Sequence, residues 1–259
     1  MTADEEPGPP GLSIAGARAT ITLRRPAHRN RLHREDLHAL QSHLRRIAAD
    51  DALRVLVLTG QGPAFCAGFH LGQLGQPDAA GTDPQLFEHT VDALAALALP
   101  TVARLNGGIH GGATDLALAC DFRIGVAGLT LRMPAARLGL HYYPGGLQRA
   151  VARLGLQAAK RLFLLAEPVD DAELLRIGYL DALVGPAQLD TAVDALCASL
   201  QAGAPLALRG MKASLDELAQ GGADPARLRE RVARCADSAD LREGLAALAE
   251  RRTPQFLGR

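Results

Sequence analysis

The chain has 259 residues, of which 48% are hydrophobic and 22% are charged, an ordinary balance for a globular protein. This length suits one large domain, or one domain with a helical appendage. The 28 basic and 28 acidic residues give a formal net charge of zero, which argues against nucleic acid as the main partner. Lys160 and Lys212 are the only lysines, so a Schiff-base mechanism would have two candidate nucleophiles.

The cysteines and the start of the chain indicate a cytoplasmic protein. The four cysteines form no CxxC pair, which is typical of reduced thiols. The first ten residues, MTADEEPGPP, have neither the basic nor the apolar region of a signal peptide, and we expect a flexible tail there. Because the chain contains no run of about eighteen apolar residues, we expect no membrane-spanning segment.

Hydrophobic periodicity predicts alternating strands and helices in the first part of the chain. ARATITL, residues 17–23, has the alternation and β-branched residues of a strand, whereas RVLVLTG, residues 54–60, is typical of a strand buried on both faces. The predicted order is strand 17–23, helix 35–49, strand 54–60, helix 85–99, strand 101–105, helix 115–119, and strands 122–126 and 129–131.

After about Gly145 the sequence is rich in Ala, Leu and Arg, and it is predicted to be almost entirely helical. Strand–helix units followed by helices indicate an α/β fold with a helical C-terminal part. We therefore expect a flexible tail over 1–10, a core over 11–195 and a C-terminal helical region over 196–259.

The familiar motifs for dinucleotide and metal binding are not complete in this sequence. Gly60-Gln-Gly62 follows a predicted strand, but Phe65 stands where the dinucleotide fingerprint has its third glycine. No cluster of Cys, His and carboxylate residues has metal-ligand spacing, so we expect no metal.

Two glycine-bearing segments remain as candidate functional sites. They are AFCAGFHL, residues 64–71, and LNGGIHGGATDLALACD, residues 105–121, and each begins at or just after a predicted strand. Glycines leave backbone N–H groups accessible to a ligand, and two such loops on neighbouring strands could form an oxyanion hole with two donors. The alternative is that these glycines only form tight turns.

Together with other motifs, these segments resemble the crotonase superfamily, the enoyl-CoA hydratase/isomerase proteins. The other motifs are ITLRRPAHRNRL, LRMPAARLG, PGGLQRAVARLG and the ending ERRTPQFLGR, in the family's order over nearly the whole chain. The resemblance implies a spiral of ββα units and a C-terminal helical region that mediates trimer contacts. We therefore expect a homotrimer or a dimer of trimers.

The resemblance also implies a coenzyme A thioester as substrate, with no permanently bound cofactor. In such proteins the thioester carbonyl lies between two backbone N–H groups, which here would be those of Phe69 and Gly112. The positions that match coenzyme A contacts are Arg29, Arg31, Ala67 and Leu71, together with Phe256 and Arg259 toward a neighbouring subunit.

The expected acids and bases are where the sequence departs from the family. Asp115 stands at the position of the first glutamate of the family's hydratases, and we expect it to handle protons. Ala135 stands at the position of the second glutamate. Addition of water needs one group to activate water and another to protonate carbon. An isomerase or another single-acid reaction therefore fits these residues better than hydration.

His141, Tyr142 and Tyr143 form a second group of candidate catalytic residues in one loop. Imidazole can act as a base near neutral pH, and a phenol can donate a hydrogen bond or a proton. The alternative is that the tyrosines pack at a subunit contact. Tyr142 also matches a tyrosine of methylmalonyl-CoA decarboxylases in the superfamily, so acyl-CoA decarboxylation is an alternative function. A non-catalytic acyl-CoA-binding protein, with its second glutamate lost at Ala135, is a third.

Overall fold

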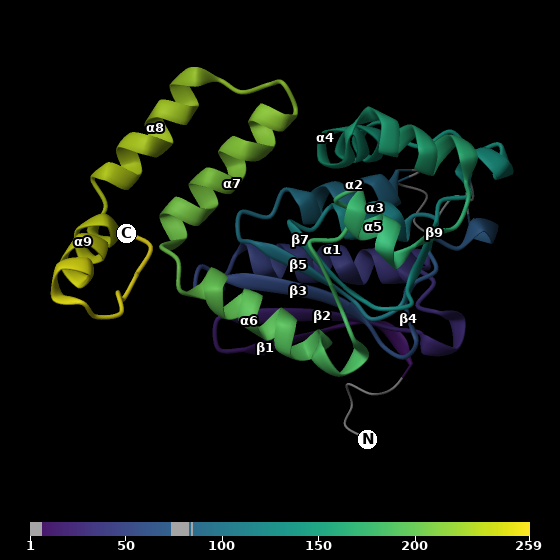
Figure 1. Ribbon diagram of the computed structural model, residues 1–259, viewed down its shortest axis with the longest axis horizontal. Coiled ribbons are helices and arrows are strands. Elements are labelled where there is room, and N and C mark those ends of the chain that lie inside the picture. The colour runs from purple at the N-terminus through teal and green to yellow at the C-terminus, as the bar shows by residue number, and fades with distance from the viewer. Residues whose placement is uncertain (1–6, 74–82, 84) are drawn as a thin grey trace.

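The computed structural model describes residues 7–73, 83 and 85–259, and it shows a mixed α/β fold with two sheets (Figure 1). The larger sheet has the order β1 (Gly8–Ala15), β2 (Arg18–Arg24), β3 (Val55–Gly60), β5 (Thr101–Leu105), β7 (Phe122–Val126) and β10 (Ala182–Val184). Strand β1 is antiparallel to β2, and the other neighbours in this sheet are parallel. The smaller sheet has the order β4 (Ala64–Cys66), β6 (Gly108–His110), β8 (Thr130–Arg132) and β9 (Val169–Asp170).

Successive strands of the larger sheet lead into a short strand of the smaller sheet and then into a helix. Strand β3 leads into β4 and α2 (Leu86–Ala95), and β5 leads into β6 and α3 (Ala113–Leu118). Strand β7 leads into β8 and, further on, α4 (Pro144–Lys160). This succession is the predicted spiral of ββα units, so the expected α/β fold is confirmed. Because β4 and β6 pair in parallel, the loops that follow them lie side by side.

The central parallel strands are buried on both faces, as the apolar run 54–60 predicts. Every residue of β3 is buried. Leu56 lies in the main core beside α1 (Arg34–Ala48), whereas Val57 lies in a second apolar cluster beside α6 (Leu189–Gln201). Helices on both faces are what a buried parallel sheet requires.

The prediction of a flexible tail over residues 1–10 is wrong for Gly8–Pro10. Gly8–Pro10 already belong to β1, which lies at the edge of the larger sheet. Prolines are tolerated on an edge strand because its outward side needs no N–H donor. Arg24 Nε also donates a hydrogen bond of 2.9 Å to the Pro9 carbonyl. Residues 1–6 lie outside the described part of the chain.

Other differences concern short elements. The sequence prediction missed β4, β6, β9 and β10, which have two or three residues each. Helix α2 ends at Ala95 rather than at Leu99, because the chain must turn back before β5 begins after Pro100. The region after Gly145 contains α5 (Asp171–Arg176) besides the longer helices.

Three helices project from the core as a helical arm, which is formed by α7 (Pro205–Ala219), α8 (Pro225–Ala236) and α9 (Ala239–Glu250) (Figure 1). The C-terminal tail returns to α9, where the backbone N–H groups of Leu257 and Gly258 donate to the Asp240 carboxylate at 2.7 and 2.9 Å. The expected boundary near residue 196 falls inside α6, which packs against the sheet. A division into domains at that point stays a prediction.

No single helix in the described part of the chain is long and apolar enough to cross a membrane. The segments Pro186–Gln201 and Pro205–Ala219 reach the necessary length and composition only when taken as a pair, and they are bent by 105°. The first of them includes α6, whose buried side chains face the larger sheet.

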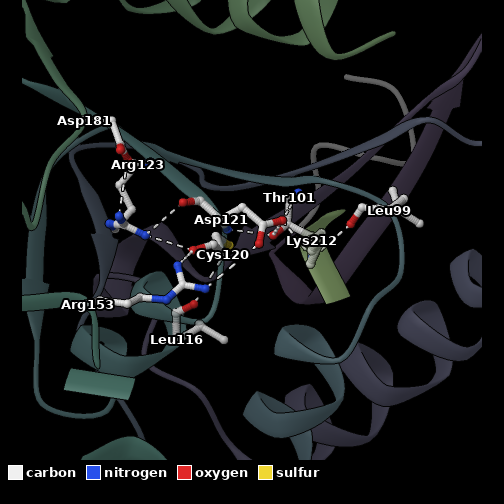
Figure 2. A network of polar contacts seen from close by, with 9 residues as sticks. All are labelled: Leu99, Thr101, Leu116, Cys120, Asp121, Arg123, Arg153, Asp181 and Lys212. Carbon is white, nitrogen blue, oxygen red and sulfur yellow. Dashed lines mark hydrogen bonds and ion pairs between the residues drawn. The ribbon is translucent and has the colours of Figure 1, made fainter. Parts of the chain in front are cut away.

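A network of polar contacts around Asp121 joins the helical arm to the core (Figure 2). Lys212 Nζ of α7 lies 2.7 Å from Asp121 Oδ2. The same carboxylate oxygen accepts hydrogen bonds of 2.8 and 2.9 Å from the backbone N–H and the hydroxyl of Thr101. Arg153 of α4 donates to the neighbouring carbonyl of Cys120, just after α3. Lys212 is therefore engaged in a structural ion pair rather than free to act as a nucleophile.

Candidate active site

The two glycine-bearing loops meet at the ends of β4 and β6. Gly68 in the first loop has a φ of +83°, a conformation that suits glycine. A Cβ atom at this position would lie 2.6 Å from the carbonyl oxygen of His110 and 2.9 Å from the backbone nitrogen of Gly112. The close approach of the two loops therefore depends on the absence of a side chain at residue 68.

The backbone N–H groups of Phe69 and Gly112 are placed on these adjoining loops. On either side of Phe69, Leu32 N donates to Gly68 O and His70 N donates to Leu32 O, each at 2.8 Å. Within the described residues, neither the N–H of Phe69 nor that of Gly112 donates a backbone hydrogen bond. Two backbone N–H groups on adjoining loops are thus without a backbone acceptor among the described residues.

Asp115 lies one helical turn beyond Gly112, fully buried in α3. Arg149 of α4 binds both carboxylate oxygens, with Nε 2.9 Å from Oδ1 and Nη2 2.7 Å from Oδ2. The hydroxyl of Tyr143 donates a third hydrogen bond, to Oδ2. Arg149 also reaches Asp92 of α2, with Nη1 2.6 Å from Oδ1. The expected proton carrier therefore already accepts three hydrogen bonds from its own chain.

Burial and charge set the protonation of this cluster. Burial lowers the pKa of Arg149, but the hydrogen bonds and negative charge of Asp115 outweigh it, so the pKa is raised and the guanidinium stays charged. Burial raises the pKa of Tyr142, and the charge of Asp115 adds to this effect. Burial, Tyr142 and Asp115 raise the pKa of Tyr143 in the same way. Both phenols therefore stay protonated at neutral pH.

Aromatic rings form a continuous row beside the ion pair. The rings of Phe69 and Phe87 are 6.0 Å apart, and those of Phe87 and Tyr143 are also 6.0 Å apart. Tyr143 stacks on Tyr142 at 4.4 Å, and Tyr142 lies 5.2 Å from Phe163. The chain has six phenylalanines, three tyrosines and no tryptophan, so this row gathers over half of its aromatic residues.

The structure thus brings together Phe69, Gly112, Asp115, Tyr142 and Tyr143, as the sequence predicts. It does not join His141 to this cluster, since that side chain is exposed and contacts the Tyr142 carbonyl at 2.8 Å through Nδ1. Ala135, at the position of the missing acid, is 5% exposed and packs in the apolar core.

The expected coenzyme A contacts fall into two separate groups. Arg29 and Ala67 lie together, since the Ala67 N–H donates to the Arg29 carbonyl at 2.8 Å. Leu71 lies on the loop that follows and is 55% exposed. Phe256 and Arg259 instead lie with the helical arm. Their carbonyl groups accept hydrogen bonds from Arg54 at 3.2 Å and from the Asp240 N–H at 3.1 Å.

A group of polar atoms beside the first loop has no partner among the described residues. It comprises Arg31 Nε, His33 Nε2 and His70 Nδ1, all of them buried. The two imidazoles meet edge to face with ring centroids 5.0 Å apart. Burial lowers the pKa of His33, and the positive charge of Arg25 adds to this effect. These atoms lie next to the positions expected to contact coenzyme A.

Sequence reasoning missed Arg149 and Phe87. Arg149 belongs to the motif PGGLQRAVARLG, but it is one of 26 arginines and nothing in its spacing singles it out. Phe87 lies within residues 72–98, a region whose side chains could not be placed from the sequence. A Cβ atom on Gly112 would lie 2.6 Å from the Phe87 ring, so this ring packs directly on the second loop.

The ββα spiral and its paired glycine loops define a protein of the crotonase class. The sequence model of the enoyl-CoA hydratase/isomerase family matches residues 14–259. The chain therefore belongs to the enoyl-CoA hydratase/isomerase family.

Individual relatives agree with this assignment. The 2,3-dehydroadipyl-CoA hydratase of Escherichia coli is 30% identical over 246 residues, which cover 92% of this chain and 94% of that protein. The crotonyl-CoA hydratase of Syntrophomonas wolfei is 29% identical over 246 residues, which cover 93% and 95%. The crystal structure of an enoyl-CoA hydratase/carnithine racemase from Magnetospirillum magneticum matches with a TM-score of 0.91 and 28% identity, covering 98% of this chain and 97% of that one.

Proposed function

We propose that this enzyme binds an acyl-CoA thioester and stabilises its enolate between the backbone N–H groups of Phe69 and Gly112. The observation that carries the proposal is the contact between the two loops at Gly68, which leaves both donors without an acceptor among the described residues. Names of relatives such as crotonyl-CoA hydratase support a thioester substrate.

An enolate links the reactions that this site could perform. Removal of a proton, addition of water and loss of carbon dioxide next to a thioester each place negative charge on the carbonyl oxygen. Two preorganised N–H donors oppose that charge, and loss of one such donor in other enzymes costs about 3 kcal/mol of transition-state stabilisation. The pair could therefore contribute much of the rate without a carboxylate.

The choice among these reactions depends on Asp115. Hydration would need a second acid, and Ala135 supplies none. Isomerisation needs one group that takes and returns a proton, and Asp115 would have to release a hydrogen bond from Arg149 or Tyr143 to do so. Isomerisation by this retained carboxylate is the form of the proposal closest to the family's hydratases and isomerases.

The pairing of Asp115 with Arg149 favours a second candidate, decarboxylation of a malonyl-type thioester. The bond between the α-carbon and the carboxylate would break, carbon dioxide would leave, and its electron pair would form the enolate. A proton from a phenol or from water would then complete the product. Tyr142 and Tyr143, whose hydroxyl oxygens are 3.5 Å apart, are the phenols nearest to Asp115. This reaction needs no carboxylate base.

Coenzyme A would lie along the first loop, at Arg29, Arg31, Ala67 and Leu71. The buried Nε of Arg31, which has no partner among the described residues, supports this placement, because phosphate groups accept hydrogen bonds from a guanidinium. Phe256 and Arg259 would reach the ligand of a neighbouring subunit in a homotrimer or a dimer of trimers. We further propose a cytoplasmic enzyme, in keeping with its four free cysteines.

The test is one incubation of the pure protein with a panel of acyl-CoAs in heavy water, followed by mass spectrometry. The panel holds saturated, 2-enoyl, 3-enoyl and malonyl-type thioesters. Addition of water, deuterium uptake or loss of carbon dioxide would support enolate chemistry, and each identifies one reaction class. Binding of thioesters without any mass change would contradict turnover and favour a non-catalytic acyl-CoA-binding protein. Absence of both thioester binding and any mass change would contradict the coenzyme A site itself.

A further inference from the structure

The Asp115 carboxylate accepts three hydrogen bonds from its own chain and is almost fully buried. Its side chain is 1% exposed, and that of Arg149 is 14% exposed. The guanidinium occupies both oxygens in a bidentate pair, and the Tyr143 hydroxyl adds a third hydrogen bond. Gly146 leaves room for the carboxylate, since a Cβ atom there would lie 2.9 Å from Asp115 Oδ2.

A carboxylate held in this way is poorly suited to take a proton from a substrate. Protonation would leave the guanidinium of Arg149, which does not give up its proton, buried beside a neutral acid. Asp92 would be its remaining partner, and the Asp92 side chain is 45% exposed. The same ion pair is well suited to hold an acceptor oxygen at a fixed place, because its two parallel hydrogen bonds prevent the carboxylate from rotating.

We propose that Arg149 and Asp115 are positioning residues, and that together they orient the Tyr143 hydroxyl without carrying the substrate proton themselves. The inference rests on the proposed enolate chemistry, and it favours decarboxylation over isomerisation by Asp115, because in decarboxylation the α-carbon only receives a proton. It assigns Asp115 the role of hydrogen-bond acceptor for Tyr143, whose ring adjoins Phe87 and, through it, the Phe69 loop. The single hydroxyl proton of Tyr143 is donated to Asp115, so the Tyr143 oxygen can hold a water molecule only as an acceptor. The proton that the α-carbon receives then comes from water, and the hydroxide left behind takes a proton from solvent.

A double-mutant cycle separates the two roles of Asp115. The variants are Asp115→Asn, Arg149→Met and the double variant, assayed with the best substrate of the thioester panel. Asp115→Asn leaves Arg149 with the half-exposed Asp92 as its partner, and Arg149→Met leaves the buried Asp115 carboxylate without a cation. We expect kcat to fall by about 100-fold in each through misplacement of Tyr143. In the double variant the amide oxygen of residue 115 can still accept from Tyr143, and the charge that loses its partner is Asp92, whose side chain is 45% exposed. We expect its kcat to recover to within about 10-fold of the wild type.

The Michaelis constant distinguishes positioning from general loss of structure. We expect KM to stay within about twofold in all three variants, because the expected coenzyme A contacts lie on other loops. Arg149→Lys, which keeps the charge but not the fork, should retain more activity than Arg149→Met. Arg153→Met is the matched control. It removes another largely buried arginine of α4, with a side chain 21% exposed, and it should lower the thermal midpoint without changing kcat.

The outcomes separate this inference from the proposed function. In one outcome the wild type is active, and the double variant is folded but as inactive as the folded Asp115→Asn variant. This result would show that Asp115 carries the proton, and it would overturn the inference but not the proposed function. A wild type that neither turns over nor exchanges any thioester would overturn both. Recovery in the double variant with an unchanged KM supports both.

Discussion

Gly68 is the single residue on which the meeting of the two loops most depends. A side chain there would face two separate costs. Its φ of +83° disfavours any L-residue, and its Cβ would lie within 3 Å of two backbone atoms of the other loop. Gly128 has a similar φ of +87° but nothing within 4 Å of its Cβ position. A comparison of these two glycines therefore separates the cost of backbone strain from the cost of a steric clash between the loops.

Alanine at each position provides the comparison. We expect Gly128→Ala to cost about 1–2 kcal/mol of unfolding free energy from the left-handed backbone alone, with kcat/KM unchanged. Gly68→Ala should cost more than this, and it should lower kcat/KM by about 100-fold because the loops must separate. Thermal unfolding and steady-state kinetics on the best thioester measure both effects. Equal kcat/KM values for the two variants would contradict the role of Gly68.

The residues of the candidate site differ in how visible they are in the sequence. Asp115 follows a distinctive glycine run, and the loop of Tyr142 and Tyr143 holds two of the chain's three tyrosines, so all three could be singled out. Arg149 could not be found in this way among 26 arginines. Its importance comes from a contact across 34 positions of sequence, which no local pattern records.

Secondary-structure elements follow the same division between local and distant causes. Strands 101–105 and 122–126 have the predicted bounds, because a short apolar run between turns is a local signal. Strands of two or three residues carry no periodicity, so the smaller sheet was not predicted. It exists because β4 pairs with β6 across some forty residues of intervening chain. Strand β1 was not predicted, because prolines are untypical of a strand.

Helix α7 is fixed to the core by the Lys212–Asp121 ion pair, whose side chains are 10% and 14% exposed. Lys212→Met should lower the unfolding free energy by about 2 kcal/mol, because it leaves a largely buried carboxylate with only the more distant Arg153, 3.9 Å from Oδ1, as its cation. Arg227→Met is the control, since the pair of Arg227 with Glu217 is exposed at 60% on its arginine side and should cost under about 1 kcal/mol. Thermal or urea unfolding measures both. Equal losses would show that Asp121 does not need Lys212.

The helical arm leaves many large apolar side chains exposed in a single chain. Leu245 and Leu248 of α9 are 60% and 77% exposed. The others on the arm are Met211, Leu215, Leu218, Val232 and Leu241. Contiguous exposed apolar surface is typical of an interface between proteins. Together with the family's helical trimer contacts, this surface supports the proposed homotrimer.

Charge placed on the arm should therefore dissociate the assembly. We expect Leu245→Glu to shift the protein toward a monomer in sedimentation analysis, because it buries an unpaired carboxylate in the interface. Leu164→Glu is the control, since Leu164 is 66% exposed but lies after α4 on the core. A wild type that sediments as a monomer, or dissociation by both variants alike, would contradict an interface on the arm.

Strand β1 has a further consequence at the open edge of the larger sheet. Pro9 and Pro10 have no N–H groups, and their carbonyl oxygens accept hydrogen bonds from Arg24 and contact His43 within the chain. An exposed edge strand usually offers its donors and acceptors to strands of other molecules, which promotes aggregation. Two successive prolines remove the donors from this stretch. We therefore expect Pro9 and Pro10 to lower the tendency of this stretch to pair edge to edge with another molecule in concentrated solution.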